Sequence, residues 1–174
     1  MNFSYKSITF IFFLLFLNNL NAEEKISYVD MDILMNNSEA GKSITSQLTL
    51  MHKKKISDLK KIEDELKKDE TEILKQKNVI SKEEFDKKIQ VLRIKAKEYQ
   101  NLRNESNESL NKKRLDSMSK LINIIQPILA DYANKNSISI IFQKKNIIIG
   151  KTELDITNDI LIILNEQHKK IEIN

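Results

Sequence analysis

The side chains that most often carry out catalysis or bind transition metals are scarce in this sequence. It contains no cysteine, and its two histidines, His52 and His168, stand far apart in the chain. A transition-metal site needs several such ligands at short spacings. Glycine occurs only at Gly41 and Gly150, so no glycine-rich loop is available to hold phosphates. No serine stands in a pattern that marks a nucleophile beside a base. We therefore expect a protein that is not an enzyme and that binds neither a metal nor a cofactor.

One cluster of carboxylates is dense enough to attract cations. It comprises Glu63, Asp64, Glu65, Asp69, Glu70 and Glu72. The face of a helix holds carboxylates too far apart to surround a calcium ion, which takes six to eight oxygen ligands. We therefore interpret the cluster as a solvated helix face.

A second group of side chains is suited to binding a polymer through charge and apolar contact. It consists of three lysines and three apolar residues: Lys87, Val91, Ile94, Lys95, Lys97 and Leu102. At 100° per residue, the apolar three lie roughly 100° or more from the centre of the main apolar stripe of their segment. Two interpretations stay open, namely scattered surface hydrophobes or a strip for transient contact with unfolded chains.

Two long helices are needed to position these side chains. Residues 42–120 contain no proline and no glycine, and their apolar residues recur at spacings of three and four, the pattern of a coiled coil. The first stripe is Leu59, Ile62, Leu66, Ile73 and Ile80. The second is Phe85, Ile89, Leu92, Ala96 and Tyr99, resuming at Leu115, Met118, Ile122, Ile125, Leu129 and Tyr132. We expect an antiparallel hairpin with arms of about 50 Å.

The polar break between the two stripes predicts where the second helix begins. Residues 77–81 interrupt the pattern, and Ser81 and Glu84 have the spacing of a capping box. Ser81 is expected to cap the new helix.

The remaining segments, 23–41 and 121–174, predict a small apolar body. Residues 26–29 are expected to form a strand, with Asp30 capping a short helix after it. Residues 137–142 and 147–149 flank a polar turn and are expected to pair as a β-hairpin. Asn136 is expected to end the long helix in the left-handed conformation, and Asp155 or Thr157 to cap a last apolar helix. The predicted fold class is therefore α+β and mostly α, with a long coiled-coil hairpin (42–120) projecting from a small β-containing body.

This body is too small and too apolar to be covered by one chain. About 70 residues give only a marginal core, and strands and a helix that are apolar on several faces need covering from more than one side. We expect several copies to share one body. The residues expected in this oligomerisation body are Ile26, Val29, Ile138, Ile140, Phe142, Ile148, Ile160 and Ile162.

The first 22 residues have the layout of a secretory signal peptide. Lys6 is followed by an apolar run over residues 8–17 and a polar stretch that ends at Ala22. Ten apolar residues are too few to span a bilayer as a helix. We expect export to the periplasm with cleavage near Ala22. An uncleaved signal, which would anchor the coiled coil to the membrane, stays open as the second interpretation.

Charge is divided unequally between the two parts. Residues 42–120 carry 21 Lys or Arg and 14 Asp or Glu, a net of +7, whereas the rest of the exported chain has a net of −4. This distribution fits either a solvated coiled-coil exterior or attraction to an anionic partner, such as an acidic client or a membrane surface. Nucleic acid is disfavoured as a partner, because export separates the protein from the nucleic acid of the cell. In addition, no aromatic residues are interleaved with the basic ones.

Motifs near both ends of the chain resemble the Skp/OmpH-like periplasmic chaperones. The motifs are Val29-Asp30-Met31, Ser38-Glu39-Ala40-Gly41-Lys42, Pro127-Ile128-Leu129, the strand at 138–142, Asp155-Ile156-Thr157, Ile160 and Leu164-Asn165. The arms match the family only in pattern, as any coiled coil would. Two places depart from it: Asn136-Ser137 stands where a Gly-Tyr pair is common, and Ile149-Gly150 where an aromatic residue is common.

The resemblance implies a homotrimer with a small β-barrel body and three helical tentacles around a cavity. It implies an ATP-independent holdase that binds unfolded outer-membrane proteins and prevents their aggregation. Contact with an anionic membrane surface or lipopolysaccharide stays possible, but no residue here matches such a motif. The alternative function is a structural coiled-coil protein of the envelope that binds a single partner through its arms.

Overall fold

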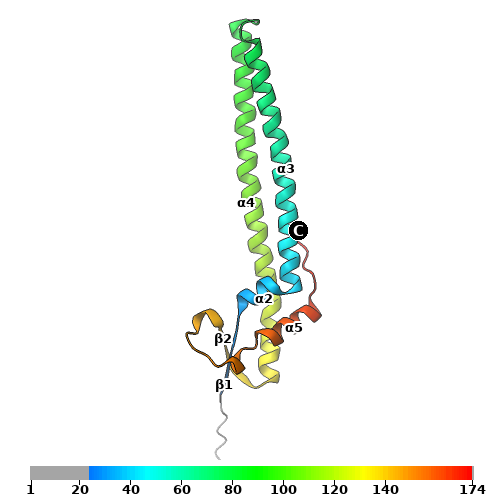
Figure 1. Ribbon diagram of the computed structural model, residues 1–174, viewed down its shortest axis with the longest axis vertical. Coiled ribbons are helices and arrows are strands. Elements are labelled where there is room, and N and C mark those ends of the chain that lie inside the picture. The colour runs from blue at the N-terminus through cyan, green and yellow to red at the C-terminus, as the bar shows by residue number, and fades with distance from the viewer. Residues whose placement is uncertain (1–23, 174) are drawn as a thin grey trace, which may run out of the picture.

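The chain folds into a long two-helix arm and a small body at its base (Figure 1). The computed structural model describes residues 24–173, so the predicted signal peptide lies outside the described residues. The arm is formed by α3 (Glu39–Gln76) and α4 (Lys82–Lys135). The body comprises β1 (Lys25–Val29), α2 (Met31–Asn37), β2 (Ile138–Gln143), the 3-10 turns η1 (Lys144–Asn146) and η2 (Thr152–Leu154), and α5 (Thr157–Gln167). The predicted fold class is confirmed.

Side-chain caps set the beginnings of three helices. Asp30 Oδ1 accepts a hydrogen bond from the amide of Ile33 at 3.1 Å, and Ser81 Oγ accepts one from Glu84 at 3.2 Å, so both predicted caps are confirmed. Ser38 Oγ caps α3 in the same way. Each cap satisfies an amide that the first helical turn leaves without a partner.

The upper part of the arm follows the predicted seam, but the lower part does not. The predicted residues of α3 are partly buried, as are Phe85, Ile89, Leu92 and Tyr99 of α4, whereas the predicted Ala96 is exposed. Nearer the body, however, Leu115, Met118 and Ile122 are 67%, 42% and 37% exposed, so the prediction that the seam resumes there is wrong.

The helix keeps its phase through this stretch. The residues of α4 that are buried in its lower half are Ser106, Ser117, Leu121, Ile125 and Ile128. Because the helix is uninterrupted, these positions stay in step with Tyr99, whereas Met118 and Ile122 lie roughly 100° further round it.

The sheet consists of two parallel strands, not the predicted hairpin. β1 pairs with β2, with Ile26 opposite Ile140 and Tyr28 opposite Phe142. Residues 147–149 form no strand, and Ile148 and Ile149 are 98% and 91% exposed. β2 therefore finds its partner at the other end of the chain.

The predicted left-handed residue is displaced by one position. Asn136 has a φ of −105°, and it is Ser137 that has a positive φ of 54°. The Asn136 side chain instead donates a hydrogen bond to the carbonyl of Tyr132 at 2.8 Å. Asn136 thus caps the end of α4, and the left-handed conformation comes at the next residue.

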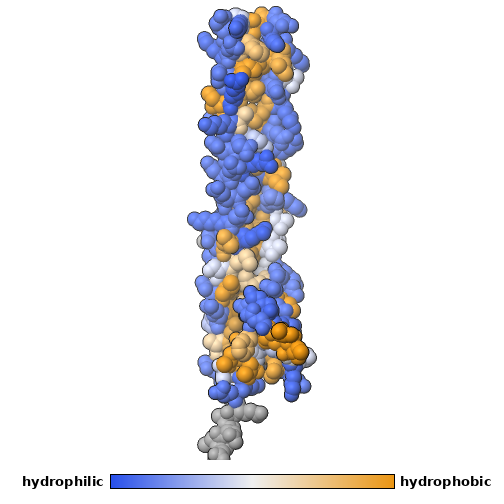
Figure 2. Space-filling model, turned by 90° about the vertical axis from the view of Figure 1, so that its left-hand side faces the viewer, coloured by the Kyte–Doolittle hydropathy of each residue, from blue (hydrophilic) through white to orange (hydrophobic). Residues whose placement is uncertain are grey.

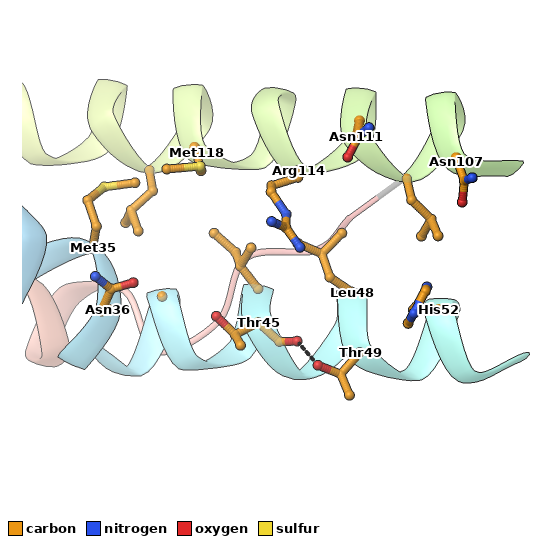
Figure 3. A pocket seen from close by; sticks show the side chains of 14 residues that line it. Met35, Asn36, Thr45, Leu48, Thr49, His52, Asn107, Asn111, Arg114 and Met118 are labelled. Carbon is orange, nitrogen blue, oxygen red and sulfur yellow. Dashed lines mark hydrogen bonds between the residues drawn. The ribbon is translucent and has the colours of Figure 1, made fainter. Parts of the chain in front are cut away.

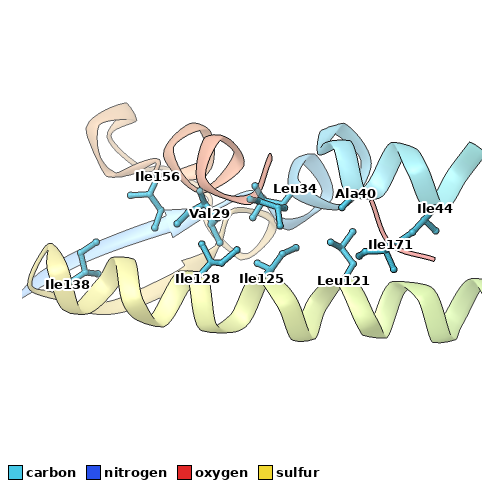
Figure 4. Close-up of a cluster of buried hydrophobic side chains, with 12 residues drawn as sticks. Val29, Leu34, Ala40, Ile44, Leu121, Ile125, Ile128, Ile138, Ile156 and Ile171 are labelled. Carbon is cyan, nitrogen blue, oxygen red and sulfur yellow. The ribbon is translucent and has the colours of Figure 1, made fainter. Parts of the chain in front are cut away.

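One hydrophobic core joins the body to the base of the arm (Figure 4). Its buried residues come from β1, α2, α3, α4, β2, α5 with the residue before it, and the C-terminal tail: Val29, Leu34, Ala40, Ile44, Leu121, Ile125, Ile128, Ile138, Ile156, Ile160, Leu164 and Ile171. α4 forms one side of the core, while β1, α2 and α5 cover the other (Figure 4). The arm is therefore fixed to the body through packed side chains.

Candidate functional site

The predicted apolar strip on α4 is exposed. Val91, Ile94 and Leu102 are 54%, 58% and 42% exposed. At 100° per residue they fall within a sector of roughly 80°. Val91 also lines a shallow hollow of about 210 Å³ together with Lys87 and Ile73. The structure therefore brings Lys87 and Val91 together beside the seam.

The three predicted lysines differ in their surroundings. Lys87 and Lys97 are exposed, but the Nζ of Lys95 lies 2.6 Å from Asp69 Oδ2 on α3. The hydrogen bond to Asp69 raises the pKa of Lys95. Because Asp69 already balances its charge, Lys95 contributes less to an anion-attracting surface than Lys87 and Lys97 do.

The body leaves a second apolar surface exposed. On the outer face of the sheet, Ile26, Ile140 and Phe142 are 42%, 44% and 44% exposed. Figure 2 shows hydrophobic residues gathered over the body on the side of β2. Ile148 is almost fully exposed beside the sheet, and Ile162 on α5 is half exposed. These five predicted body residues are available for contact with another chain.

The other predicted body residues are used within the chain. Val29, Ile138 and Ile160 are at most 8% exposed and belong to the core cluster. They support the body from inside, so the exposed set of Ile26, Ile140, Phe142, Ile148 and Ile162, defined here as the outer apolar surface, is the part that can be shared.

A groove that sequence reasoning missed lies between α3 and α4 near the body (Figure 3). Its volume is about 570 Å³. Its lining includes the apolar side chains of Leu48 and Met118 and the polar side chains of His52, Asn111 and Arg114. The spacing of Asn111 and Arg114 predicts that both lie on one helix face. Residue spacing does not predict that α3 and α4 separate beside them to open a groove.

A network of hydrogen bonds ties both ends of the chain together in the body. Asp155 Oδ1 accepts from the amide of Thr157 at 3.0 Å and from its hydroxyl, and Lys144 Nζ lies 3.0 Å from Asp155 Oδ2. The Thr157 hydroxyl oxygen in turn accepts from the amide of Asp30 at 2.8 Å. Burial alone would raise the pKa of Asp155, but the bonds from Thr157 and Lys144 outweigh it and lower that pKa.

Further polar contacts attach α5 to the arm. The Tyr132 hydroxyl on α4 donates to Asp159 Oδ2, and this bond raises the pKa of Tyr132 to about 12. The amide of Glu39 at the start of α3 donates to Asn165 Oδ1 at 2.8 Å. Both arm helices are thus bonded directly to α5.

Among residues 24–173, no group of three or more His, Asp or Glu side chains is placed to hold a metal ion. Within the same residues, no helix combines the length and the hydropathy needed to cross a bilayer.

Comparison with known proteins places the chain in a family. The family model described as outer membrane protein (OmpH-like) matches residues 25–164. The chain belongs to the OmpH-like family. The resemblance seen in the motifs at the two ends is therefore confirmed, and the matched residues include both helices of the arm.

This OmpH-like chain is similar over most of its length to a curated protein and to a solved structure. A Skp-like protein from Chlamydia pneumoniae is 26% identical over 171 residues, which cover 95% of this chain and 98% of the relative. A crystal structure of a Caulobacter crescentus protein, assigned as an OmpH-like outer membrane chaperone, superposes with a TM-score of 0.83. At 12% identity, over 87% of this chain and 89% of the other, this similarity concerns the fold.

Proposed function

We propose that this OmpH-like protein is an ATP-independent holdase chaperone of the periplasm. It binds unfolded outer-membrane proteins between its arms and keeps them from aggregating. The observation that carries the proposal is the exposure of large apolar side chains in two separate places, the outer apolar surface of the body and the strip on α4. Membership of the OmpH-like family supports the same role.

The outer apolar surface is proposed to assemble three copies. The outer face of the sheet leaves Ile26, Ile140 and Phe142 partly in water, and an exposed apolar patch of this kind favours contact with another chain. Contact between the outer surfaces of neighbouring copies buries these side chains and joins three sheets into a single body. The arms then project from the shared body and surround a cavity.

The arms are proposed to hold clients through many weak contacts. The strip residues Val91, Ile94 and Leu102 offer apolar area without a deep pocket, and Lys87 and Lys97 attract acidic segments. Such contacts can each break quickly while their sum retains the client. Release then needs no nucleotide.

The test is an aggregation assay with a client that folds as a β-barrel. An outer-membrane protein is diluted from urea in the presence of the purified protein lacking residues 1–22, and light scattering is followed. Suppression at a ratio of about three chains per client, without ATP, is the expected result. A protein that leaves scattering unchanged at any ratio, or that binds one folded partner only, would instead be a structural coiled coil.

A further inference from the structure

The C-terminal tail, residues 168–173, lies against the base of the arm. It leaves α5 and runs back beside α3 (Figure 1). Ile171 is 8% exposed and packs in the core with Ile44 and Leu121 (Figure 4). Ile173 is partly buried against the same cluster, whereas Glu172 between them is exposed. Alternate residues therefore face the arm, as in a strand lying on an apolar surface.

One side chain of α3 binds the main chain of this tail. Gln47 Nε2 donates to the carbonyl of Ile171 at 2.7 Å, and Gln47 Oε1 accepts from the amide of Ile173 at 3.2 Å. The two bonds lie on either side of Glu172, which is how a neighbouring strand in a parallel sheet bonds to its partner. A further bond to Ser43 Oγ at 3.1 Å orients the Gln47 amide.

This surface places few demands on sequence. Within the tail, Gln47 bonds to peptide groups, which every residue has, and the hollow beside Ile173 is lined by Ser117 and Lys120 of α4. The requirement is an extended segment with apolar side chains at positions i and i+2. Strands of transmembrane β-barrels have this pattern, because their lipid-facing residues alternate with polar ones.

We propose that the surface around Gln47 is a binding site for extended, alternately apolar segments of clients, and that the tail occupies it until a client displaces it. The proposal rests on the proposed holdase function and adds to it a location on the arm and a recognition rule. The tail is attached by two hydrogen bonds to one side chain and by two isoleucines. Terminal segments attached by so few contacts open at low cost.

The first test uses variants of the full chain and a fluorescent ten-residue peptide whose isoleucines alternate with polar residues. Replacing both Ile171 and Ile173 with Ser releases the tail and leaves the site intact. Because the site is then free, peptide affinity measured by fluorescence anisotropy should rise about tenfold or more. Adding Gln47→Leu to this variant should abolish the gain.

Controls separate this competition from general loosening of the body. Lys169→Ser alters an exposed residue of the same tail and should leave affinity unchanged. A peptide of identical composition with its isoleucines three residues apart should bind none of the variants more tightly than it binds the wild-type protein. Unchanged or lower affinity in a tail-released variant of normal helix content would overturn the proposal.

The second test observes displacement directly by an unfolded outer-membrane protein. The chain has no cysteine and no tryptophan, so Glu172→Cys labelled with bimane and Lys120→Trp form a unique quenching pair. Quenching should be relieved as the client is added, and aggregation is measured in the same samples. Suppressed aggregation with unrelieved quenching contradicts the tail site and leaves the holdase function standing. Peptide binding without any suppression contradicts the holdase function instead.

Discussion

At the scale of single residues, the two end motifs that suggested the family are in direct contact. The amide of Asp30 donates to the Thr157 hydroxyl oxygen, and the amide of Ile156 donates to the carbonyl of Tyr28 at 3.0 Å. Asp155 accepts both polar hydrogens of Thr157 and so orients that hydroxyl. These short motifs therefore have a structural role, which is to close the body.

Asp155→Asn should destabilise the body in a pH-dependent way. The pKa of Asp155 is lowered in the folded chain, so its charged form adds stability above the unfolded pKa of about 3.9, and this stability is lost as pH falls through the folded value. Loss of charge-assisted bonds should cost about 1–2 kcal/mol at pH 7. Urea unfolding at fixed protein concentration should show that the difference in unfolding free energy between wild type and variant becomes smaller below pH 4. An equal difference at pH 7 and pH 3 would contradict the assignment.

At the scale of elements, the capped starts of α2 and α4 were predictable, but two other features were not. The N-cap of α5 is Ile156, without a side-chain cap, so the prediction of Asp155 or Thr157 was wrong, and the strand pairing was wrong as well. Caps such as Asp30 and Ser81 act on amides three residues away, so their signal is local. The partner of β2 is β1, at the other end of the chain. Of the polar residues 143–146 that suggested a hairpin turn, the first ends β2 and the other three form η1. Nothing in residues 137–149 alone distinguishes these two outcomes.

Some features of the candidate site were likewise predictable from the sequence, and others were not. The exposure of Val91, Ile94 and Leu102 follows from helical angle alone, and the structure agrees. The prediction of a seam at Leu115 was wrong because the buried face of α4 keeps the helical phase of Ser117 and Leu121, and Leu115 lies outside that phase. The groove beside His52 and the position of the tail on Gln47 depend on contacts between segments that are distant in sequence. The spacing of apolar residues carries no information on such contacts.

The junction of α2 and α3 depends on one glycine. Gly41 is buried in the first turn of α3, and a Cβ there would overlap the carbonyl group of Met35 in α2. Because that neighbour is main chain, α2 would have to move, so Gly41→Ala should lower the unfolding free energy by roughly 2 kcal/mol or more. Thermal or urea unfolding measures this. Lys42→Ala, an exposed change one residue later, is the control and should stay near wild type.

At the scale of the whole molecule, assembly should depend on the outer apolar surface. Ile140→Asp places a charge on the outer face of the sheet, where shared burial would leave it unpaired. Since Ile140 is 44% exposed in the single chain, the variant should keep its helix content and become monomeric by light scattering. Val79→Asp, at an 81% exposed position of the arm tip, should leave the mass unchanged. A wild-type protein with a monomer mass would refute assembly altogether.

Client retention should depend on the apolar strip. Replacing Val91, Ile94 and Leu102 with Ser removes contacts of about 1 kcal/mol each, so release of an unfolded outer-membrane protein should be roughly a hundredfold faster. Stopped-flow fluorescence of a labelled client measures the release rate. Leu50, Ile56 and Leu74 of α3 are similarly exposed and provide a matched triple variant. Equal effects of both triples would show that the arm binds clients without preference for the strip.

Client capture should depend on the unpaired lysines. Lys87→Glu combined with Lys97→Glu reverses two charges that face solvent, so association with an acidic client should slow and become less sensitive to salt. Lys95 is left unchanged because it bonds to Asp69. Association rates at low and high ionic strength provide the measurement. Rates that match wild type at low salt would contradict a steering role for these two lysines.

The pairing of β1 with β2 sets the order in which this molecule can be completed. A chain is made from its N-terminus, so the first strand exists long before residues 138–143 are added. Until then β1 has no strand partner, whereas α3 and α4, whose sequences lie between β1 and β2, can already form. Each newly made copy therefore passes through a stage in which it has finished arms and an open, aggregation-prone edge. A protein with this topology is, during its own synthesis, in need of the same protection that we propose it gives to others.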